Sequence, residues 1–395
     1  MHYSINIHNG IGSVKSGGWS AMREQVISFV RLVMETVLQA EQEEQMGCQR
    51  YERSKLRHNY ANGSYKRTLS TSHGVIPGIT IPRLRKGSFV SQLLTKYRRR
   101  VEEVDRSLLS WYLQGESCRD VVRSMQVWTQ DVLSAQTVSR LIQTIDARLR
   151  QWRQRPLPHD LVAVWLDGFW IKVRVKHKVR SYVILAALGR HKDGRWEVLS
   201  FRLAESESEL RWKELLHQMH ARGMRTALFI HDGAGGIQEA LRWDYPGVKT
   251  QRCLVHKLRN ILEMVTEEKH RTLIQHDFWS IYDTSDTEEA RARFGSFCRR
   301  WIRSEPQAVF TARRGWQSTV TFLELADDAV RTLCRSTNIM EFLYRELRRR
   351  VKVIGAFPTP QSAERIIFGT LLYIENVNLN KSGNMPSLLQ QFTHN

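Results

Sequence analysis

Three acidic residues stand where a carboxylate needs a strong partner. Asp167 lies within the apolar run VAVWLDGFWIKVRV, Asp232 ends the apolar run in TALFIHDGAGG, and Glu341 lies in the helical segment NIMEFLYRELRRR. A carboxylate among apolar side chains is costly to bury unless a cation or hydrogen-bond donors compensate its charge. If the three converge, a divalent metal ion supplies that compensation. For Asp167 taken alone, a strand-end residue that caps a turn is at least as good an explanation.

A site of three carboxylates suits two divalent cations. One activates a water or a 3′ hydroxyl, and the other stabilises the leaving oxygen of an in-line displacement. Oxygen ligands favour Mg²⁺ or Mn²⁺ over zinc, which prefers His and Cys. The spacings, 65 residues from Asp167 to Asp232 and 109 from Asp232 to Glu341, are weak support in a chain with 40 acids. The positions of the three residues on predicted strands and on a later helix are stronger support.

The elements that would position these acids form an α/β pattern. Strands are predicted at 162–175, 181–191 and 196–206, and the short turns between them indicate an antiparallel meander. The order then continues as helix, strand, helix, strand and helix, at 207–223, 225–233, 236–245, 248–253 and 254–265. Residues 266–335 have mostly helical patterns, and a capped helix with Glu341 follows them. The sequence therefore predicts a mixed sheet with a helical insertion before the third acid.

Two further groups of residues lie near these acids in the pattern. Cys253 and His256 form a Cys-x-x-His pair, but no second pair at ligand spacing suggests a zinc site. A buried Cys and a helix-start His that only pack explain the pair equally well from the residues alone. Downstream of Glu341, helical spacing places basic side chains on one side of the helix. These are Arg345, Arg348, Arg349 and Lys352. These side chains would bind phosphates next to the scissile one; the alternative is a solvated basic face.

The charge of the chain indicates a polyanionic partner. The 395 residues include 60 Lys or Arg and 40 Asp or Glu, so the net charge is +20. Nucleic acid is the favoured partner; a solubilising surface or a binder of acidic membranes is the alternative. Between Arg50 and Arg100 there are 13 basic residues and one acid, interleaved with aromatic residues. We expect a compact DNA-binding module there, with a tight turn at Asn62-Gly63, rather than a solvated loop.

The pattern of the segment after this module, two short helices joined by a turn, predicts a helix-turn-helix. A helix starts near Cys118, and Ser134 caps a second helix. In such motifs the start of the second helix faces base edges in the major groove. The residues presented there would be Gln136, Thr137, Ser139 and Arg140. Two helices that merely pack together would show a similar pattern. Further upstream, residues 20–46 have helical apolar spacing and predict an amphipathic helix that packs locally or on a second subunit.

The cysteines and the hydropathy bear on the compartment. The five cysteines are scattered without a Cys-x-x-Cys pair, which fits a reducing cytoplasm. The first residues, MHYSINIHNG, lack the apolar stretch of a signal peptide. No apolar run approaches the roughly 20 residues that span a bilayer. We therefore expect a cytoplasmic protein without a membrane partner.

Taken together, the motifs resemble those of the Mutator-type DDE transposases of bacterial insertion sequences. The resemblance runs from about Tyr51 to Ile374. It comprises LDGFWIKVR with Asp167, HDGAGG with Asp232, QRCLVHKLRN with Cys253 and His256, and STNIMEFLYRELRRR with Glu341. The YERS and IPRLRKGSF segments also resemble the family. One departure is Tyr344, which stands where the family usually has Asn three residues after the Glu.

The resemblance implies a ribonuclease-H-like catalytic core and Mg²⁺-dependent DNA cleavage and joining. It also implies catalytic and metal-binding roles for Asp167, Asp232 and Glu341, a place for Cys253 and His256 near the active site, and N-terminal modules that bind terminal inverted repeats. We expect double-stranded DNA, both repeats and target, as partner, and a homo-oligomer on DNA. The expected segments are an N-terminal helix at 1–46, a basic module at 47–100, a helix-turn-helix-like domain at 101–155, catalytic core at 156–265 and 336–395, and the insertion at 266–335.

Two alternatives stay open from the sequence. A non-catalytic helix-turn-helix regulator would bind DNA without needing the acids at 167, 232 and 341. A metal-dependent nuclease would share the active site but would cut without joining. Only the products formed from DNA separate these alternatives from a transposase.

Overall fold

The computed structural model describes residues 18–96, 98–129, 131 and 133–375. Two parts of the predicted segments, 1–17 and 376–395, lie outside the described residues. The chain folds into two compact units, of which the first extends to Thr144 and the second begins at Ile145. This division falls within one helix, upstream of the segment boundary expected at 155/156.

The first unit begins with a helix packed on a β-hairpin. Its elements are α1 (Gly18–Met46), β1 (Ala61–Thr71), β2 (Gly74–Leu84), α2 (Glu102–Leu113) and α3 (Cys118–Thr129). Met34 and Leu38 of α1 share a core with apolar residues of the hairpin, such as Leu69 and Ile79. A different side of α1 exposes large apolar side chains, namely Met22, Val26, Phe29, Leu32 and Val37.

The prediction of a tight turn at Asn62-Gly63 is wrong. Both residues lie inside β1, and the strands are joined instead through Ser72 and His73. Gly63 has a positive φ of 69°, and the pairing register shifts between Ala61 and Ser64. The Asn-Gly signal therefore marks an irregularity in a long strand, because a glycine in the left-handed region also suits a β-bulge.

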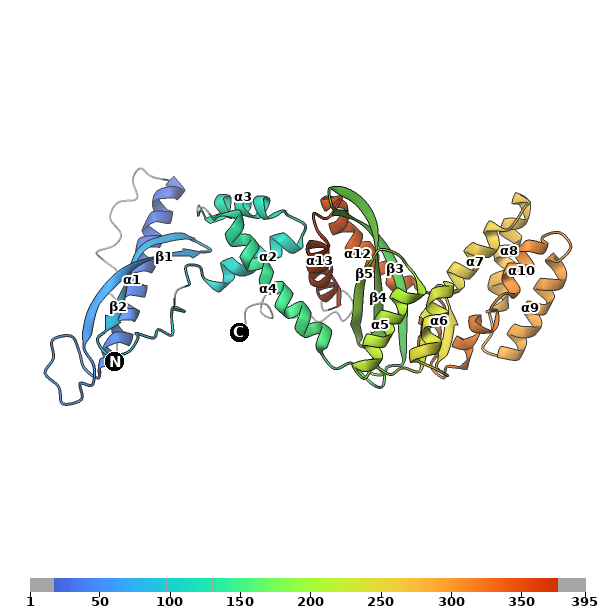
Figure 1. Cartoon of the computed structure of the whole chain (residues 1–395), viewed down its shortest axis with the longest axis horizontal. Helices are drawn as coiled ribbons and strands as arrows, with labels where there is room; N and C mark the ends of the chain where they lie inside the picture. Colours follow the sequence, from blue (N-terminus) through green and yellow to red (C-terminus); the bar gives the residue numbers. More distant parts are fainter. Residues whose placement is uncertain (1–17, 97, 130, 132, 376–395) are drawn as a thin grey trace. The chain divides into compact units, whose positions relative to one another are not determined.

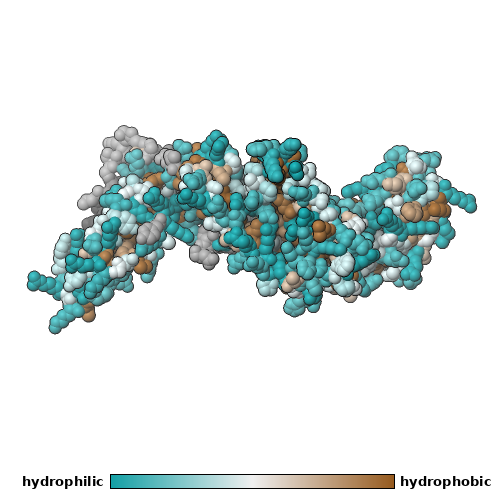
Figure 2. Space-filling view, viewed as in Figure 1, coloured by the Kyte–Doolittle hydropathy of each residue, from teal (hydrophilic) through white to brown (hydrophobic). Residues whose placement is uncertain are grey.

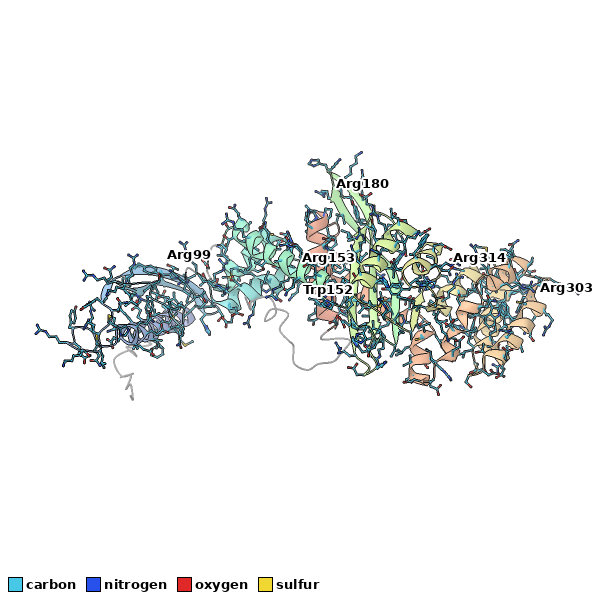
Figure 3. All side chains as sticks on the ribbon, turned by 60° about the horizontal axis from the view of Figure 1, so that its bottom comes forward. Arg99, Trp152, Arg153, Arg180, Arg303 and Arg314 are labelled. Carbon is cyan, nitrogen blue, oxygen red and sulfur yellow. The ribbon has the colours of Figure 1, made fainter. Side chains whose placement is uncertain are left out.

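Helix α4 (Ala135–Gln154) follows α3 after a short connection. Ser134 caps it, because its hydroxyl oxygen accepts a hydrogen bond from the Thr137 backbone nitrogen at 3.1 Å. The later part of α4 belongs to the second unit, where Trp152 packs against Phe201 and Phe368. Figure 3 shows Trp152 and Arg153 beside α13.

The second unit is built on the mixed sheet that the sequence predicted. Its strands are β3 (Ala163–Val175), β4 (Lys178–Arg190), β5 (Trp196–Ala204), β6 (Leu228–His231) and β7 (Lys249–Arg252). Their spatial order is β5-β4-β3-β6-β7 (Figure 1). The first three strands pair antiparallel, whereas β6 and β7 join in parallel. The antiparallel meander followed by alternating strands and helices is thus confirmed.

Helices cover both faces of this sheet. They are α5 (Glu209–Ala221) and α6 (Gly235–Asp244) on one face, and α12 (Asn338–Ile354) and α13 (Pro360–Tyr373) on the other. Helix α7 (Leu254–Glu263) follows β7 and leads to the helical insertion. Residues Val164 and Leu166 of β3 share a core with α5 and α6. Because side chains alternate along a strand, the intervening residues Trp165, Asp167 and Phe169 point to the opposite face. That face meets α12, where Tyr344 stacks on Phe169 with ring centroids 5.2 Å apart.

Between α7 and α12 the chain forms a helical insertion. It contains α8 (Glu268–Ile281), α9 (Thr287–Trp301), α10 (Pro306–Arg313), the 3₁₀ turns η2 (Gln317–Thr319) and η3 (Thr321–Glu324), and α11 (Asp328–Cys334). Buried Lys257 of α7 ties the insertion to the sheet unit, since its ammonium donates to the carbonyl oxygens of Thr311 and Arg314 at 2.6 and 2.7 Å.

Hydrophilic residues dominate the face of the molecule in Figure 2, with smaller hydrophobic patches between them. Among the described residues, no helix is long and apolar enough to cross a membrane.

Candidate active site

Asp167 lies in the middle of β3 and is flanked by fully paired strand backbone. It is paired with Ala186 of β4 in the antiparallel register. One of its carboxylate oxygens accepts a hydrogen bond from the Gly168 backbone nitrogen at 2.9 Å. The side chain is half-buried on the sheet face that carries α12. This position is a strand interior and does not cap a turn, so the simpler explanation for Asp167 is wrong.

Asp232 directly follows β6, which lies beside β3. Its carboxylate accepts a hydrogen bond from the Ala234 backbone nitrogen at 2.8 Å, just before α6 begins. The preceding residue, His231, is fully buried, and burial lowers its pKa to about 4. The cationic side chain near Asp232 is instead Arg252 of β7, whose Nε donates to the Asp232 carbonyl oxygen at 3.4 Å and whose charge interacts with the Asp232 carboxylate.

Asp167 and Asp232 are close enough to influence each other electrostatically. Burial raises the pKa of Asp167 to about 7, and the negative charges of Asp232 and Glu207 act in the same direction, against the Gly168 hydrogen bond and His256. Neither aspartate forms an ion pair in the described part of the chain. The two half-buried carboxylates supply oxygen ligands of the kind that Mg²⁺ or Mn²⁺ prefers.

A third carboxylate near the two aspartates is Glu207, which the sequence reasoning missed. A Cβ built on Gly168 would lie 3.0 Å from both Glu207 carboxylate oxygens, so the glycine makes room for this side chain. Burial raises the pKa of Glu207 to about 6, and Asp232 contributes. In the sequence, Glu207 is one of three acids in AESESEL, and nothing local distinguishes it. The glycine directly after Asp167 is the one signal of a close approach.

Glu341 lies in the first turn of α12 and is exposed. It is one helical turn before Tyr344, whose hydroxyl donates to the Asp167 carbonyl oxygen at 2.6 Å. Because residues three and four apart share a helix face, the Glu341 side chain lies on the exposed face of α12 together with Arg345 and Arg348. Within the described residues, no three His, Cys, Asp or Glu side chains are grouped closely enough to hold a metal ion. The convergence of all three predicted acids therefore stays a prediction.

Tyr344 lies one helical turn after Glu341, on the buried side of α12. Its ring is buried and stacked on Phe169, and burial raises the pKa of its hydroxyl well above the ordinary value. The neutral hydroxyl donates to the backbone of Asp167. Tyr344 thus gives α12 a direct contact with the strand that carries Asp167.

Cys253 and His256 lie between the second and third acids in the sequence, and they connect the end of β6 with Thr337, the residue before α12. Cys253 is fully buried at the start of α7, and its Sγ is 3.3 Å from His256 Nδ1. Burial alone would raise the pKa of the Cys253 thiol, but hydrogen bonds with His256 and Thr337 lower it. The contact with Cys253 raises the pKa of His256, and Asp167 and Asp232 add to that effect.

The basic residues predicted on the helix of Glu341 are exposed on α12. Arg348 lies over the Phe169 ring, with its guanidinium carbon 5.4 Å from the centroid. Arg345 stacks over Phe342, and Arg349 pairs with Glu346 at 2.9 Å. Lys352 has no ion pair in the described part of the chain. Arg348 is therefore the basic side chain that the contacts place nearest to the strand of Asp167.

The four residues predicted to face base edges lie in the first turns of α4, in the first unit. Gln136 and Arg140 are exposed, whereas Thr137 and Ser139 are half-buried. The Thr137 hydroxyl is 2.9 Å from that of Ser134. Gln136 and Arg140 are thus the two side chains most available for contact with another molecule.

The chain is similar to known transposases over most of its length. The family model described as "Transposase, Mutator family" matches residues 18–378. The transposase for insertion sequence element ISRM5 of Rhizobium meliloti (strain 1021) is 32% identical over 339 residues, which cover 86% of this chain and 84% of that protein. The transposase for insertion sequence element IS406 of Burkholderia multivorans is 30% identical over 350 residues, with coverage of 88% and 89%.

Among solved structures, the Drosophila P element transposase strand transfer complex matches 71% of this chain and 93% of that chain. The TM-score is 0.36 and the sequence identity is 10%. This likeness is too weak to support a structural argument.

Proposed function

Because the chain belongs to the Mutator family of transposases, we propose that it is a DDE transposase with a ribonuclease-H-like core. It binds the terminal inverted repeats of an insertion sequence and catalyses metal-dependent cleavage and transfer of DNA strands. The observation that carries the proposal is the pair of half-buried carboxylates, Asp167 within β3 and Asp232 directly after the adjacent strand β6. Helix α12, which carries Glu341 in its first turn, lies on the sheet face to which Asp167 points.

Asp167 and Asp232 would hold Mg²⁺ or Mn²⁺, and Glu341 would complete the ligand set. The bound cations supply activation of a water or 3′ hydroxyl and stabilisation of the leaving oxygen. Each aspartate is oriented by a backbone nitrogen that donates to one oxygen, at 2.9 Å for Asp167 and 2.8 Å for Asp232. The other oxygen of each carboxylate is then available for the cation.

The basic side of α12 would bind the phosphates next to the scissile one. Arg345, Arg348, Arg349 and Lys352 follow Glu341 along the helix, and all four are exposed. Charged donors beside a carboxylate–metal site hold the DNA backbone in register without reading its sequence. Recognition of the terminal repeats is assigned to the first unit, through the basic hairpin and the start of α4 with Gln136, Thr137, Ser139 and Arg140.

We further propose that the protein acts as a homo-oligomer on DNA. The apolar side of α1, with Phe29 and Leu32 exposed by 49% and 59%, supports self-association. A transposase of a bacterial element acts on chromosomal DNA, so the proposed location is the cytoplasm, at the nucleoid.

One experiment separates the transposase from its alternatives. The purified protein is incubated with Mg²⁺ and a labelled duplex that carries the terminal repeat of its own element, beside an Asp232→Asn variant. The expected result is cleaved and joined products with the wild type and none with the variant. Cleavage without joining would indicate a nuclease. Tight binding without metal-dependent chemistry in either protein would indicate a DNA-binding regulator and would overturn the proposal.

A further inference from the structure

We propose that Cys253, His256 and Thr337 form a hydrogen-bonded junction that positions Glu341 relative to Asp167 and Asp232. This inference rests on the proposed function, because it assigns a task within the same site. The three residues would not touch substrate, and their role would be to position the helix that carries the third acid.

The first observation is the orientation of Thr337, the residue before α12. A threonine at this position ordinarily caps its own helix, and such a cap contributes about 1 kcal/mol. The Thr337 side chain makes no capping hydrogen bond. Its hydroxyl lies 3.5 Å from Cys253 Sγ and 3.3 Å from His256 Nδ1. Thr337 is 1% exposed. Its hydroxyl therefore contacts Cys253 and His256 at the start of α7 and does not cap α12.

The backbone of Thr337 strengthens this connection in both directions. Its nitrogen donates to Cys253 Sγ at 3.3 Å. Its carbonyl oxygen accepts a hydrogen bond from the Glu341 backbone nitrogen at 3.2 Å. One residue thus links the buried sulfur directly to the first turn of α12, and a shift at the sulfur would move Glu341.

The neighbouring residues extend the junction to the other two acids. The Cys253 backbone nitrogen donates to the carbonyl oxygen of His231, directly before Asp232, at 2.8 Å. The Trp165 indole nitrogen, two residues before Asp167, donates to the Ser336 carbonyl oxygen at 3.1 Å. The end of β6, the Trp165 side chain of β3 and the start of α12 are therefore joined through Cys253 and the segment from Ser336 to Thr337.

A zinc site is the competing explanation for the Cys-x-x-His pair. The contacts use the Sγ and Nδ1 atoms for Thr337 and for each other. In the part of the chain that the structure describes, no third His, Cys, Asp or Glu completes a metal-binding group around them. Hydrogen bonding between the two elements therefore explains the pair better than zinc ligation.

The test uses Thr337→Val, which removes the hydroxyl at nearly constant volume, and Cys253→Ala, which removes the sulfur acceptor. Thr337→Ser restores a hydroxyl. Cys298→Ala is the matched control, because Cys298 is also buried but lies in α9 of the insertion. The full-length protein is assayed for cleavage of the terminal-repeat duplex, with kcat and KM measured separately.

Displacement of a group around a metal site typically costs about 10- to 100-fold. We expect Thr337→Val and Cys253→Ala to lower kcat by about that factor while KM for DNA changes less than about twofold. Thr337→Ser recovers most of kcat, and Cys298→Ala behaves as the wild type. If the wild type cleaves and both junction variants keep its kcat, the inference is wrong and the proposed function stands.

A second measurement does not depend on catalysis. Mn²⁺ binding to the protein is followed by the loss of the free-ion electron paramagnetic resonance signal, for the wild type, Thr337→Val and Glu341→Gln. Thr337→Val should weaken Mn²⁺ binding about as much as Glu341→Gln does. If Thr337→Val binds Mn²⁺ as tightly as the wild type, the proposed positioning role is wrong, even for a protein that does not cleave DNA. Absence of both cleavage and Mn²⁺ binding in the wild type would reject the proposed function together with the inference.

Discussion

At the scale of single residues, Asp167 is held in a state that favours a cation. Its carboxyl is half-buried, and it is close to Asp232 and Glu207. Without a cation, folding brings like charges together and removes them from water, which is unfavourable. Functional sites commonly lower the stability of the unliganded protein in this way, because the charges that bind a ligand are placed close together before it binds.

The raised pKa of Asp167 predicts how the free energy of unfolding depends on pH. The folded pKa of Asp167, about 7, exceeds its ordinary value of 3.8. The stability contributed by its protonated form is therefore fully present below about pH 4 and is lost as pH rises through about 7. Asn cannot ionise, so Asp167→Asn should stabilise the metal-free protein at pH 8 by about 2 kcal/mol, a value discounted for partial exposure. Urea unfolding at pH 5 and pH 8 measures the effect.

Added Mg²⁺ supplies the control for that experiment. It should stabilise the wild type at pH 8 and have little effect on Asp167→Asn. A variant that is less stable than the wild type at pH 8 without metal would contradict this prediction.

Glu207 leads to a second prediction at this scale. Its carboxylate adds negative potential at Asp167 and Asp232, although it comes from the loop before α5. Glu207→Gln should raise the Mg²⁺ concentration for half-maximal cleavage about 3- to 10-fold, because attraction for a cation falls when a nearby charge is removed.

A Mg²⁺ titration of the cleavage rate tests this effect. Glu209→Gln is the matched control, since Glu209 is a neighbouring acid whose exposed carboxylate pairs with Lys213. Equal Mg²⁺ requirements for Glu207→Gln and the control would exclude Glu207 from the site.

At the scale of elements, the helical insertion depends on one buried acid. Glu305 is 1% exposed, and its carboxylate accepts hydrogen bonds from the Thr266 and Glu267 backbone nitrogens at 2.9 and 3.1 Å. His270 Nδ1 lies 2.8 Å from the same carboxylate. Burial alone would raise the pKa of Glu305, but these hydrogen bonds hold it at about 2. Glu305 thereby joins the start of α10 to the start of α8.

Removal of this carboxylate should destabilise the insertion. Glu305→Ala leaves buried donors without a partner, which costs about 3 kcal/mol. Because the folded pKa is lowered, the stability from Glu305 is present above about pH 4.5 and is lost as pH falls toward 2. The difference between variant and wild type should therefore shrink below pH 4.5 in urea unfolding. Glu268→Ala, at an exposed acid of α8, is the control, and an equal effect of both variants would refute this role.

At the scale of the whole molecule, the net charge of +20 and the two compact units suggest that different parts of the chain provide affinity and specificity for DNA. Contacts with phosphates provide affinity that falls with salt, whereas contacts with base edges provide specificity. In the proposed function, the start of α4 reads sequence, and the basic side of α12 binds phosphates.

Two single variants distinguish these roles. Arg140→Ala should reduce the preference for the terminal repeat over random duplex by about 1–3 kcal/mol, as expected for a lost base contact. Arg345→Ala should weaken binding to both duplexes equally and reduce the salt slope by about one. Fluorescence anisotropy at several salt concentrations measures both quantities. Equal loss for both duplexes in Arg140→Ala would remove the start of α4 from sequence recognition.

Local patterns determined much of this protein in advance. The alternation of VAVWLDGFWIKVRV and the two short turns after it predict the antiparallel meander, because side-chain period and turn residues are local properties. The same patterns place Asp167 on a strand, Asp232 at a strand end and Glu341 on a helix. The Asn-Gly signal failed because a positive φ suits both a hairpin turn and a bulge within a strand.

The sequence by itself thus determined the order of the elements, the acids with their motifs and the basic character of the chain. Only the tertiary structure decided that Glu207 approaches Asp167 across Gly168, that Tyr344 contacts the strand of Asp167, and that Thr337 binds Cys253. The physical reason is distance along the chain. Cys253 and Thr337 are separated by 84 positions, so no local periodicity connects them. Their contact exists only because β6, β3 and α12 pack together in the folded chain.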